Sequence, residues 1–273
     1  MNKIRKILSS KVFITLVWTL GIIIVWEVCA TLVAEVKRTP ENVLPHLSGI
    51  VDSLTSDKKI NGSQTAFQMV LENAGATLSR AAFGYLIGII SGFLLALLMS
   101  LSGIVEKIAF PYLMLIQLIP ILGMAPIINA ITGDISISRI VIAAILTFYP
   151  VAANTLAGFK AVRKESHELM YSYAANKFQL YTKTMIPACI PYFFTGLKIS
   201  APMAITASIL VDTLQGGIGL GCLLSQSLKG AMTRYVFWDI VVFSAVIGIF
   251  SFYLMGIIET ILCPYKRVGK KGR

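Results

Sequence analysis

Six apolar stretches, each long enough to cross a lipid bilayer, constrain this chain more than any other feature of its sequence. Only 14% of its 273 residues are charged and 56% are hydrophobic, whereas a typical soluble domain carries about 25% charged residues. The sequence therefore predicts an all-α polytopic membrane helix bundle, which forms a single domain over residues 1–273. The six predicted spans cover residues 12–34, 76–101, 108–131, 138–161, 190–212 and 236–262.

The distribution of basic residues predicts how these spans are oriented. With a cytoplasmic N-terminus, the cytoplasmic segments hold 15 Lys and Arg residues and the external segments hold 7. Cytoplasmic loops of membrane proteins carry such an excess. The first apolar run is also too long for the core of a cleaved signal peptide. We therefore expect a multi-pass protein of the inner (cytoplasmic) membrane with both termini in the cytoplasm.

Composition and motifs argue against several classes of protein. The net charge is +11, but the basic residues lie between apolar runs, where they contact anionic lipid head groups, so we expect lipid and not nucleic acid as a partner. The four cysteines form no CxxC pair and the chain has two histidines, so we expect no metal site. The sequence contains no HExxH, GxSxG or Gly-Lys-Ser/Thr motif, so we expect neither catalytic residues nor ATP hydrolysis by this chain.

Glycine and proline mark the second and third stretches. Gly84, Gly88 and Gly92 are spaced four apart and share one helix face. Such a stripe allows a second helix to approach closely, so helix packing is the favoured interpretation, with a glycine-lined substrate path as the alternative. Pro120 and Pro126 interrupt the third stretch, and proline kinks a helix. The interruption is either an ordinary packed kink or a break that lines a pathway.

Ionisable side chains within the predicted spans are functional candidates by default. Packing or snorkelling explains Glu27 and Glu259, which lie near polar neighbours or span ends. Lys198 either lines a cavity or pairs with an acid. Arg80 and Asp239 complete the set, and the sequence alone supplies no partner that supports a proton relay.

The most informative segment is the loop at 163–187, between the fourth and fifth stretches. It is too polar to span the membrane, and it has no Pro or Gly from Ser166 to Thr184. Its apolar residues predict two short helices joined at the small pair Ala174–Ala175. A rigid cytoplasmic helix can dock on a soluble motor and transmit its movement to the bundle, and an amphipathic helix lying on lipid is the alternative.

This loop resembles the cytoplasmic Glu-Ala-Ala loop of permeases from binding-protein-dependent ABC importers. Glu168 matches the family's Glu, and Ile186–Pro187 match its closing Leu/Ile-Pro pair. The chain departs from the pattern where Leu169–Met170 replace the two alanines and where Ala174 replaces a glycine. Alanine adopts a left-handed turn less easily than glycine. The departure therefore affects the expected geometry of the turn more than the expected docking of the loop on a partner.

Further segments resemble the same family in the right order. They are closest to its nitrate, sulfonate and taurine branch, which includes permeases for thiamine-precursor pyrimidines. The segments are VWEVCA (25–30), Leu44–Pro45, FYPVAANTLAGFKAV (148–162), PACIPYFFTGLKIS (187–200) and DTLQGGIGLGCLL (212–224).

The resemblance implies a type I ABC importer permease fold and a subunit that forms the translocation path. It implies as partners an ABC ATP-binding subunit, an extracytoplasmic substrate-binding protein and a second permease subunit, for which we expect a homodimer. It also implies that ATP and Mg²⁺ bind the partner and that this chain holds no cofactor. The implied substrate is a small organic or inorganic anion or a thiamine-precursor-like molecule. The predicted coupling residues are Glu168, Leu169, Tyr173, Ala174, Ala175, Phe178 and Pro187.

Two other functional classes remain open at this point. An ATP-independent secondary transporter or channel needs no motor-docking helix and usually shows paired charges within the membrane. A membrane scaffold protein needs no kinked, polar third span. For the transport classes, the predicted path-lining residues are Gln117, Met124, Asn154, Ser200 and Thr206.

Overall fold

The computed structural model describes residues 11–37, 43–229 and 235–263. Most of the basic residues of both terminal segments, on which the predicted orientation partly depends, lie outside these ranges. The chain forms two compact units, which are described separately below. The first comprises Met1–Val70 and Gln226–Val241, and the second comprises Leu71–Ser225 and Val242–Arg273.

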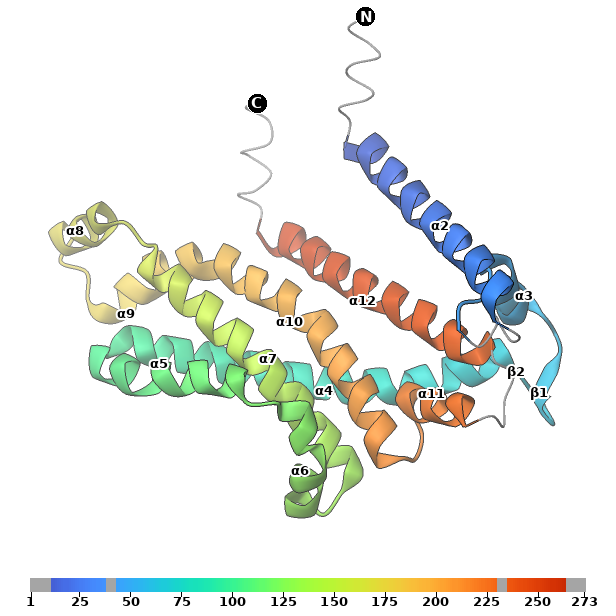
Figure 1. Cartoon of the computed structure of the whole chain (residues 1–273). Helices are drawn as coiled ribbons and strands as arrows, with labels where there is room; N and C mark the ends of the chain where they lie inside the picture. The colour runs from blue at the N-terminus through green and yellow to red at the C-terminus, as the bar shows by residue number, and fades with distance from the viewer. Residues whose placement is uncertain (1–10, 38–42, 230–234, 264–273) are drawn as a thin grey trace, which may run out of the picture. The chain divides into compact units, whose positions relative to one another are not determined.

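Long apolar helices dominate the described residues (Figure 1). Five of them are long and apolar enough to cross a membrane, or six if a pair of helices bent by 80° counts as one span. This confirms the predicted membrane helix bundle. The spanning helices are α2 (Lys11–Val36), α4 (Ala66–Leu101), α7 (Ile135–Lys160), α10 (Ile186–Gln215) and α12 (Tyr235–Leu262), and the bent pair joins α5 (Gly103–Leu118) to α6 (Ala125–Thr132).

The helix ends differ from the predicted span ends where a helix continues past its apolar part. Helix α4 begins at Ala66, whereas the apolar stretch begins at residue 76. The additional turns contain Gln68, Glu72 and Asn73. These polar residues lower the mean hydropathy, so a prediction from hydropathy leaves them out of the span. Backbone hydrogen bonds satisfy a helix in water and in lipid alike, so a change of polarity does not end it.

The glycine stripe packs α4 against α7 in the second unit. A Cβ added at Gly84 would lie 2.5 Å from the carbonyl oxygen of Ile140, and one added at Gly88 would lie 2.5 Å from the Cβ of Thr147. At Gly92 the added atom would lie 2.8 Å from the carbonyl oxygen of Phe148. Real Cβ atoms do not approach so closely, which confirms that the stripe is a helix-packing surface.

The interruption in the third stretch is a sharp break between α5 and α6. Ile119 has extended geometry (ψ 132°), as expected for a residue that precedes proline, and a 3-10 turn at Ile121–Met124 follows Pro120. Pro126 stands in the first turn of α6, where its missing N–H is tolerated. Helix α6 ends at Thr132, and Gly133 after it has left-handed geometry (φ 68°).

The first unit joins α2 to a short helix, a hairpin and the start of α12. Helix α3 (Leu47–Thr55) is followed by strands β1 (Lys59–Asn61) and β2 (Gln64–Thr65), which pair antiparallel. The Trp26 ring meets Trp238 edge to face at 5.1 Å between centroids, and its Nε1 donates to the carbonyl oxygen of Pro45. These contacts fix α2 within the unit although its apolar surface is mostly exposed.

Candidate functional site

The loop at 163–187 folds into two short helices, as the sequence predicts. Helix α8 covers Lys164–Ser172 and α9 covers Lys177–Leu180, and both lie at the ends of α7 and α10 (Figure 1). The Asn176 side chain accepts from the backbone N–H of Gln179, and the Gln179 side chain accepts from that of Asn176. This capping box starts α9 and makes the joint between the helices a defined turn.

Ala174 holds the turn in left-handed geometry. Its φ is +50°, the only positive value among non-glycine residues in the described part of the chain. Its N–H donates to the carbonyl oxygen of Tyr171, and the N–H of Ala175 donates to that of Met170. These two bonds form the Schellman motif, in which the position of Ala174 is usually glycine. The turn typical of glycine therefore forms with alanine, at a cost of about 1–2 kcal/mol in backbone strain.

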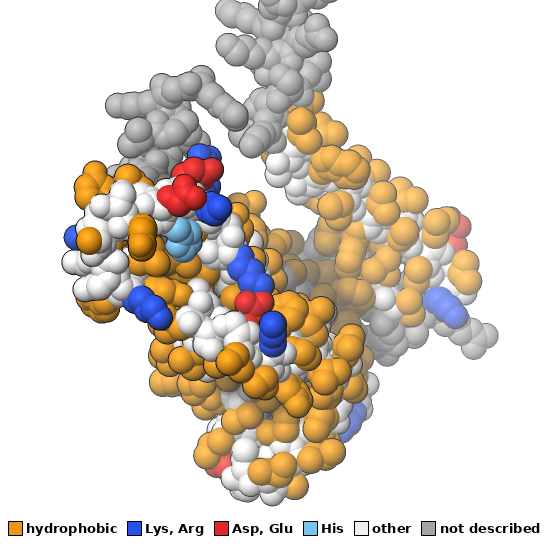
Figure 2. Space-filling view, turned by 90° about the vertical axis from the view of Figure 1, so that its left-hand side faces the viewer, with side chains coloured by type: hydrophobic (Ala, Val, Ile, Leu, Met, Phe, Trp, Pro, Cys, Tyr) orange, Lys and Arg blue, Asp and Glu red, His pale blue; other side chains and the backbone are white. Residues whose placement is uncertain are grey.

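Large apolar side chains project from α8, the turn and α9. Leu169 is 55% exposed, and Tyr173 and Phe178 are each 76% exposed. Figure 2 faces the end of the molecule that carries these helices, and a group of basic and acidic side chains gathers there beside hydrophobic ones. Glu168 and Ala175 line a hollow of about 410 Å³ in the same element. Such a surface, apolar with a charged rim, is typical of a protein-docking site.

Behind this surface, α9 continues into α10 through a π-helical turn at Tyr181–Met185. The N–H of Ile186 donates to the carbonyl oxygen of Tyr181, five residues earlier. Pro187 follows directly; it has no N–H, and its ring does not fit against the carbonyl group four residues before it in a regular α-helix. The widened turn accommodates the proline, which gives Pro187 a structural role at the base of the element.

The predicted path residues lie in different surroundings. Gln117 on α5 and Thr206 on α10 are exposed, and Met124 is half-buried in the 3-10 turn. The Asn154 side chain donates to the carbonyl oxygen of Pro150 at 2.7 Å. Ser200 is buried on a different face of α10 from Thr206 and donates to the carbonyl oxygen of Gly196. Their role in a path stays a prediction.

A buried ionic cluster, which sequence reasoning did not assemble, joins three spanning helices of the second unit. The Asp212 carboxylate on α10 is fully buried and lies 3.1 Å from Nη2 of Arg80 on α4 and 2.9 Å from Nε of Arg139 on α7. It also accepts a hydrogen bond from the Thr77 hydroxyl at 2.6 Å. Arg80 and Arg139 donate further to the carbonyl oxygens of Ile218 and Gly216.

The cluster thereby holds the glycine-rich segment that leads into α11 (Leu220–Leu228). The N–H of Leu220 donates to the Thr77 hydroxyl oxygen, and the N–H of Gly219 donates to the side chain of Asn73. Gly219 has φ +152°, and a Cβ there would collide with the Asp212 carboxylate. These glycines therefore form a packed turn, in agreement with the missing nucleotide-binding motif.

Further ionisable side chains within the spans have partners. Lys198 on α10 forms an ion pair with Glu259 on α12, so the structure confirms that Lys198 pairs with an acid. In the first unit, Asp239 is fully buried and accepts a hydrogen bond from Ser53 at 2.8 Å. Among the described residues, no group of three or more His, Cys, Asp or Glu side chains is placed to hold a metal ion.

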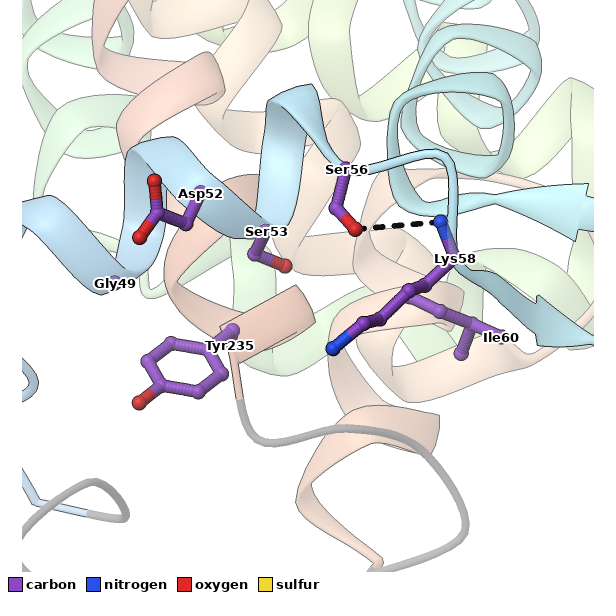
Figure 3. Close-up of a pocket in the computed structure, with 7 residues that line it drawn as sticks. All are labelled: Gly49, Asp52, Ser53, Ser56, Lys58, Ile60 and Tyr235. Atoms are coloured by element: carbon purple, nitrogen blue, oxygen red, sulfur yellow. Dashed lines mark hydrogen bonds between the residues drawn. The ribbon is translucent and has the colours of Figure 1, made fainter.

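A pocket of about 400 Å³ lies in the first unit between α3, β1 and the start of α12 (Figure 3). The Lys58 amine points into it beside the ring of Tyr235, and Ser56 accepts a hydrogen bond from the Lys58 N–H. Asp52 lines the same pocket with a charge of opposite sign. The lining therefore shows no preference for anions over cations.

Known proteins are similar to this chain over most of its length. The family model described as "Binding-protein-dependent transport system inner membrane component" matches residues 84–262. The formylaminopyrimidine transport permease protein ThiX of Halalkalibacterium halodurans is 29% identical over 248 residues, which cover 91% of this chain and 94% of that protein. The taurine transport system permease protein TauC of Escherichia coli is 25% identical over 248 residues, covering 90% and 86%.

Solved structures share the fold. A crystal structure of an amino acid ABC transporter with histidines matches with a TM-score of 0.57 at 18% identity, over 71% of this chain and 92% of that one. An inward-facing structure of the MetNI methionine ABC transporter matches with a TM-score of 0.55 at 18% identity, over 72% and 94%. At this identity the likeness concerns the fold alone.

Proposed function

Because this chain belongs to the family of inner membrane components of binding-protein-dependent transport systems, we propose that it forms the translocation path of an ATP-driven importer and docks on its ATP-binding subunit through α8 and α9. As a member of this family it is a multi-pass, non-catalytic permease of the inner membrane, and ATP is bound by the partner ATPase. Binding-protein-dependent transport implies that an ATPase and a substrate-binding protein act with it.

One observation carries the docking proposal. Leu169, Tyr173 and Phe178 present apolar surface on an element that is too polar to lie inside the membrane. Helix α9 has a capping box and α8 ends in a Schellman turn, so both keep their shape without a partner. A rigid apolar projection transmits a push better than a flexible loop, which suits a subunit that moves with a motor.

The secondary-transporter alternative predicts paired charges within the membrane, and such pairs are present. Each, however, has a packing role: Arg80 on α4 and Arg139 at the start of α7 both hold Asp212 near the end of α10, and Lys198 ties α10 to Glu259 on α12. A relay needs a series of groups that exchange protons, and arginine does not release its proton in proteins. The pairs therefore support a structural role, and the family favours the ATP-driven importer.

For the substrate we propose a small organic or inorganic anion or a thiamine-precursor-like molecule. The support is the range of relatives, whose names specify formylaminopyrimidine, nitrate and taurine transport. We further propose that two copies of this chain form the path. The exposed side of α10, which carries Thr206 and Met203, is available to face the second copy.

We also propose that both termini, α8 and α9 lie in the cytoplasm and that the α3–hairpin segment lies outside. The excess of Lys and Arg in the corresponding segments supports this orientation. A membrane-impermeant maleimide tests it in spheroplasts. Lys58→Cys should react in intact spheroplasts and Lys177→Cys only after lysis, and the opposite order would reverse the proposed topology.

The experiment that tests the function is purification of the tagged protein from its native membrane in mild detergent. Wild type should retain an ATP-binding subunit, and Glu168→Ala and Ala174→Asp should retain less of it. Ala174→Asp places a charge at the strained turn of the docking surface. A chain that purifies alone and transports in liposomes without ATP would overturn the proposal in favour of a secondary transporter.

A further inference from the structure

The base of the cytoplasmic element makes a specific contact with α4. The Tyr181 hydroxyl donates to the carbonyl oxygen of Ser100 at 2.8 Å, and its oxygen lies 3.0 Å from the Ser100 hydroxyl. Because Tyr181 uses its proton on the carbonyl group, the Ser100 hydroxyl is the donor of the second bond. One phenol group therefore forms two hydrogen bonds to a single residue, 81 positions away in the sequence.

Tyr181 stands where the regular α-helical hydrogen bonding between α9 and α10 is interrupted. It is the first residue of the π-helical turn between α9 and α10, and such turns interrupt the regular hydrogen-bond ladder. Its ring meets Phe159 at 6.2 Å between centroids and packs on a core cluster that includes Met99 and Leu156. Three residues earlier, Phe178 points outward and is 76% exposed. The same short segment thus has a free outer face and a fixed inner face.

We propose that Tyr181 is the pivot at which α9 is pinned to α4, so that a push on the exposed side of α9 turns α10 instead of sliding the whole element. This inference rests on the proposed function, because it assumes that a motor pushes on α9. Tyr181 is a positioning residue: its hydroxyl fixes one point of the lever, and the π-helical turn allows the bend beside it. Without the hydrogen bonds from Tyr181 to Ser100, movement of α9 bends the π-helical turn and is not passed on to α10.

Tyr181→Phe tests the pivot because it removes both hydrogen bonds and keeps the ring in the core. The readout uses the detergent-purified complex of the permease with its ATP-binding subunit and needs no substrate. Spin labels on two exposed positions measure distances from a reference label at Leu94→Cys on α4. The label at Lys177→Cys reports the input at α9, and the label at Ile199→Cys reports the output at α10. Native Cys29, the exposed cysteine in the described residues, is replaced by Ser.

In wild type, both distances should change between ADP and ATP with vanadate. In Tyr181→Phe the input change should persist while the output change falls by about half or more, as expected when a lever loses its fixed point. Ser100→Ala removes one of the two bonds and should have a smaller effect, and the double variant should match Tyr181→Phe. Tyr253→Phe is the matched control, because it removes a hydroxyl from a tyrosine that is 63% exposed on α12.

The outcomes separate the pivot from the proposed function. An output change in Tyr181→Phe equal to that of wild type, with the ATP-binding subunit retained, would overturn the pivot and leave the docking proposal intact. Equal loss of the input and output changes would also overturn it, because that result indicates general loosening of the element. If wild type retains no ATP-binding subunit, or shows no nucleotide-dependent change at α9, the proposed function itself fails.

Discussion

The carboxylate of Asp212 lies 2.9 Å from Nε of Arg139, and both side chains are buried at the ends of two spanning helices. Arg80 on a third helix shares the same carboxylate. The single carboxylate of Asp212 therefore balances one of the two positive charges that the arginines bring to this site. Removing it leaves two guanidinium groups with no acid to balance them, held by the carbonyl oxygens of Ile218 and Gly216 and by the sulfur of Cys222.

Asp212→Asn keeps the volume of the side chain and removes its charge. Loss of one member of a buried ion pair costs about 3–5 kcal/mol, so we expect a large fall in the unfolding temperature in detergent. Glu106→Gln is the matched control because it breaks the Lys160–Glu106 pair, whose lysine is more than half exposed. The control should cost about 1 kcal/mol or less. Equal melting temperatures for the two variants would contradict the structural role of the cluster.

Gly88→Ala should destabilise the packing of α4 on α7. The new Cβ would lie 2.5 Å from the Cβ of Thr147 and 2.6 Å from the carbonyl oxygen of Ala144, so the helices must separate. Gly75→Ala is the control on the same helix, since nothing lies within 4 Å of its Cβ. We expect a lower unfolding temperature and a lower folded yield for Gly88→Ala only. A neutral Gly88→Ala would show that the close approach is not required.

Ala174→Gly should relieve backbone strain in the turn between α8 and α9. Glycine adopts left-handed geometry without the penalty of about 1–2 kcal/mol that alanine incurs. The variant should retain the ATP-binding subunit at least as well as wild type when the complex is challenged with rising detergent. Ala175→Gly is the control, because the φ of Ala175 is not positive and glycine only adds flexibility there. Stronger retention by Ala175→Gly than by Ala174→Gly would contradict the turn geometry.

Cys222 should be unreactive in the folded protein. Burial raises the pKa of its thiol, as does the nearby Asp212 carboxylate, so at neutral pH the protonated, non-nucleophilic form prevails. We expect little alkylation by N-ethylmaleimide at pH 7, a rise only above the usual thiol range, and full reaction after unfolding. In a chain otherwise free of cysteine, Ile218→Cys is the exposed control and should react at once. Rapid reaction of Cys222 at pH 7 would contradict its buried placement.

The sequence predicts the parts of this molecule that depend on local pattern. Hydropathy locates the spanning helices, and the apolar residues at 166–184 predict α8 and α9 with their joint at Ala174–Ala175. The left-handed φ of Ala174 does not follow from its sequence, because the intrinsic preference of alanine disfavours that geometry. The two Schellman hydrogen bonds stabilise the left-handed turn in spite of this preference.

Contacts between distant residues were less predictable. Arg80 and Asp212 are 132 residues apart, and nothing in either local sequence specifies the other. Arg139 lies in a short external segment by the predicted orientation, and no motif around Thr77 marks it as a partner of an acid. One available signal was that Arg139 and Asp212 both stand at the external ends of predicted spans, where opposite charges can meet. The π-helical turn depends on Pro187 and on the tertiary contact of Tyr181, which no periodicity reveals.

Photo-crosslinking from position 178 tests the central claim, that α9 docks on an ATP-binding subunit. A benzoylphenylalanine replaces Phe178 in native membranes, and in a matched chain it replaces Phe250, a 61% exposed phenylalanine in the span α12. We predict that position 178 forms an adduct with a protein that carries a Gly-Lys-Ser/Thr nucleotide-binding motif and that position 250 does not. Adducts of position 178 with lipid alone, as at position 250, would show that α9 lies on the membrane and would contradict the account.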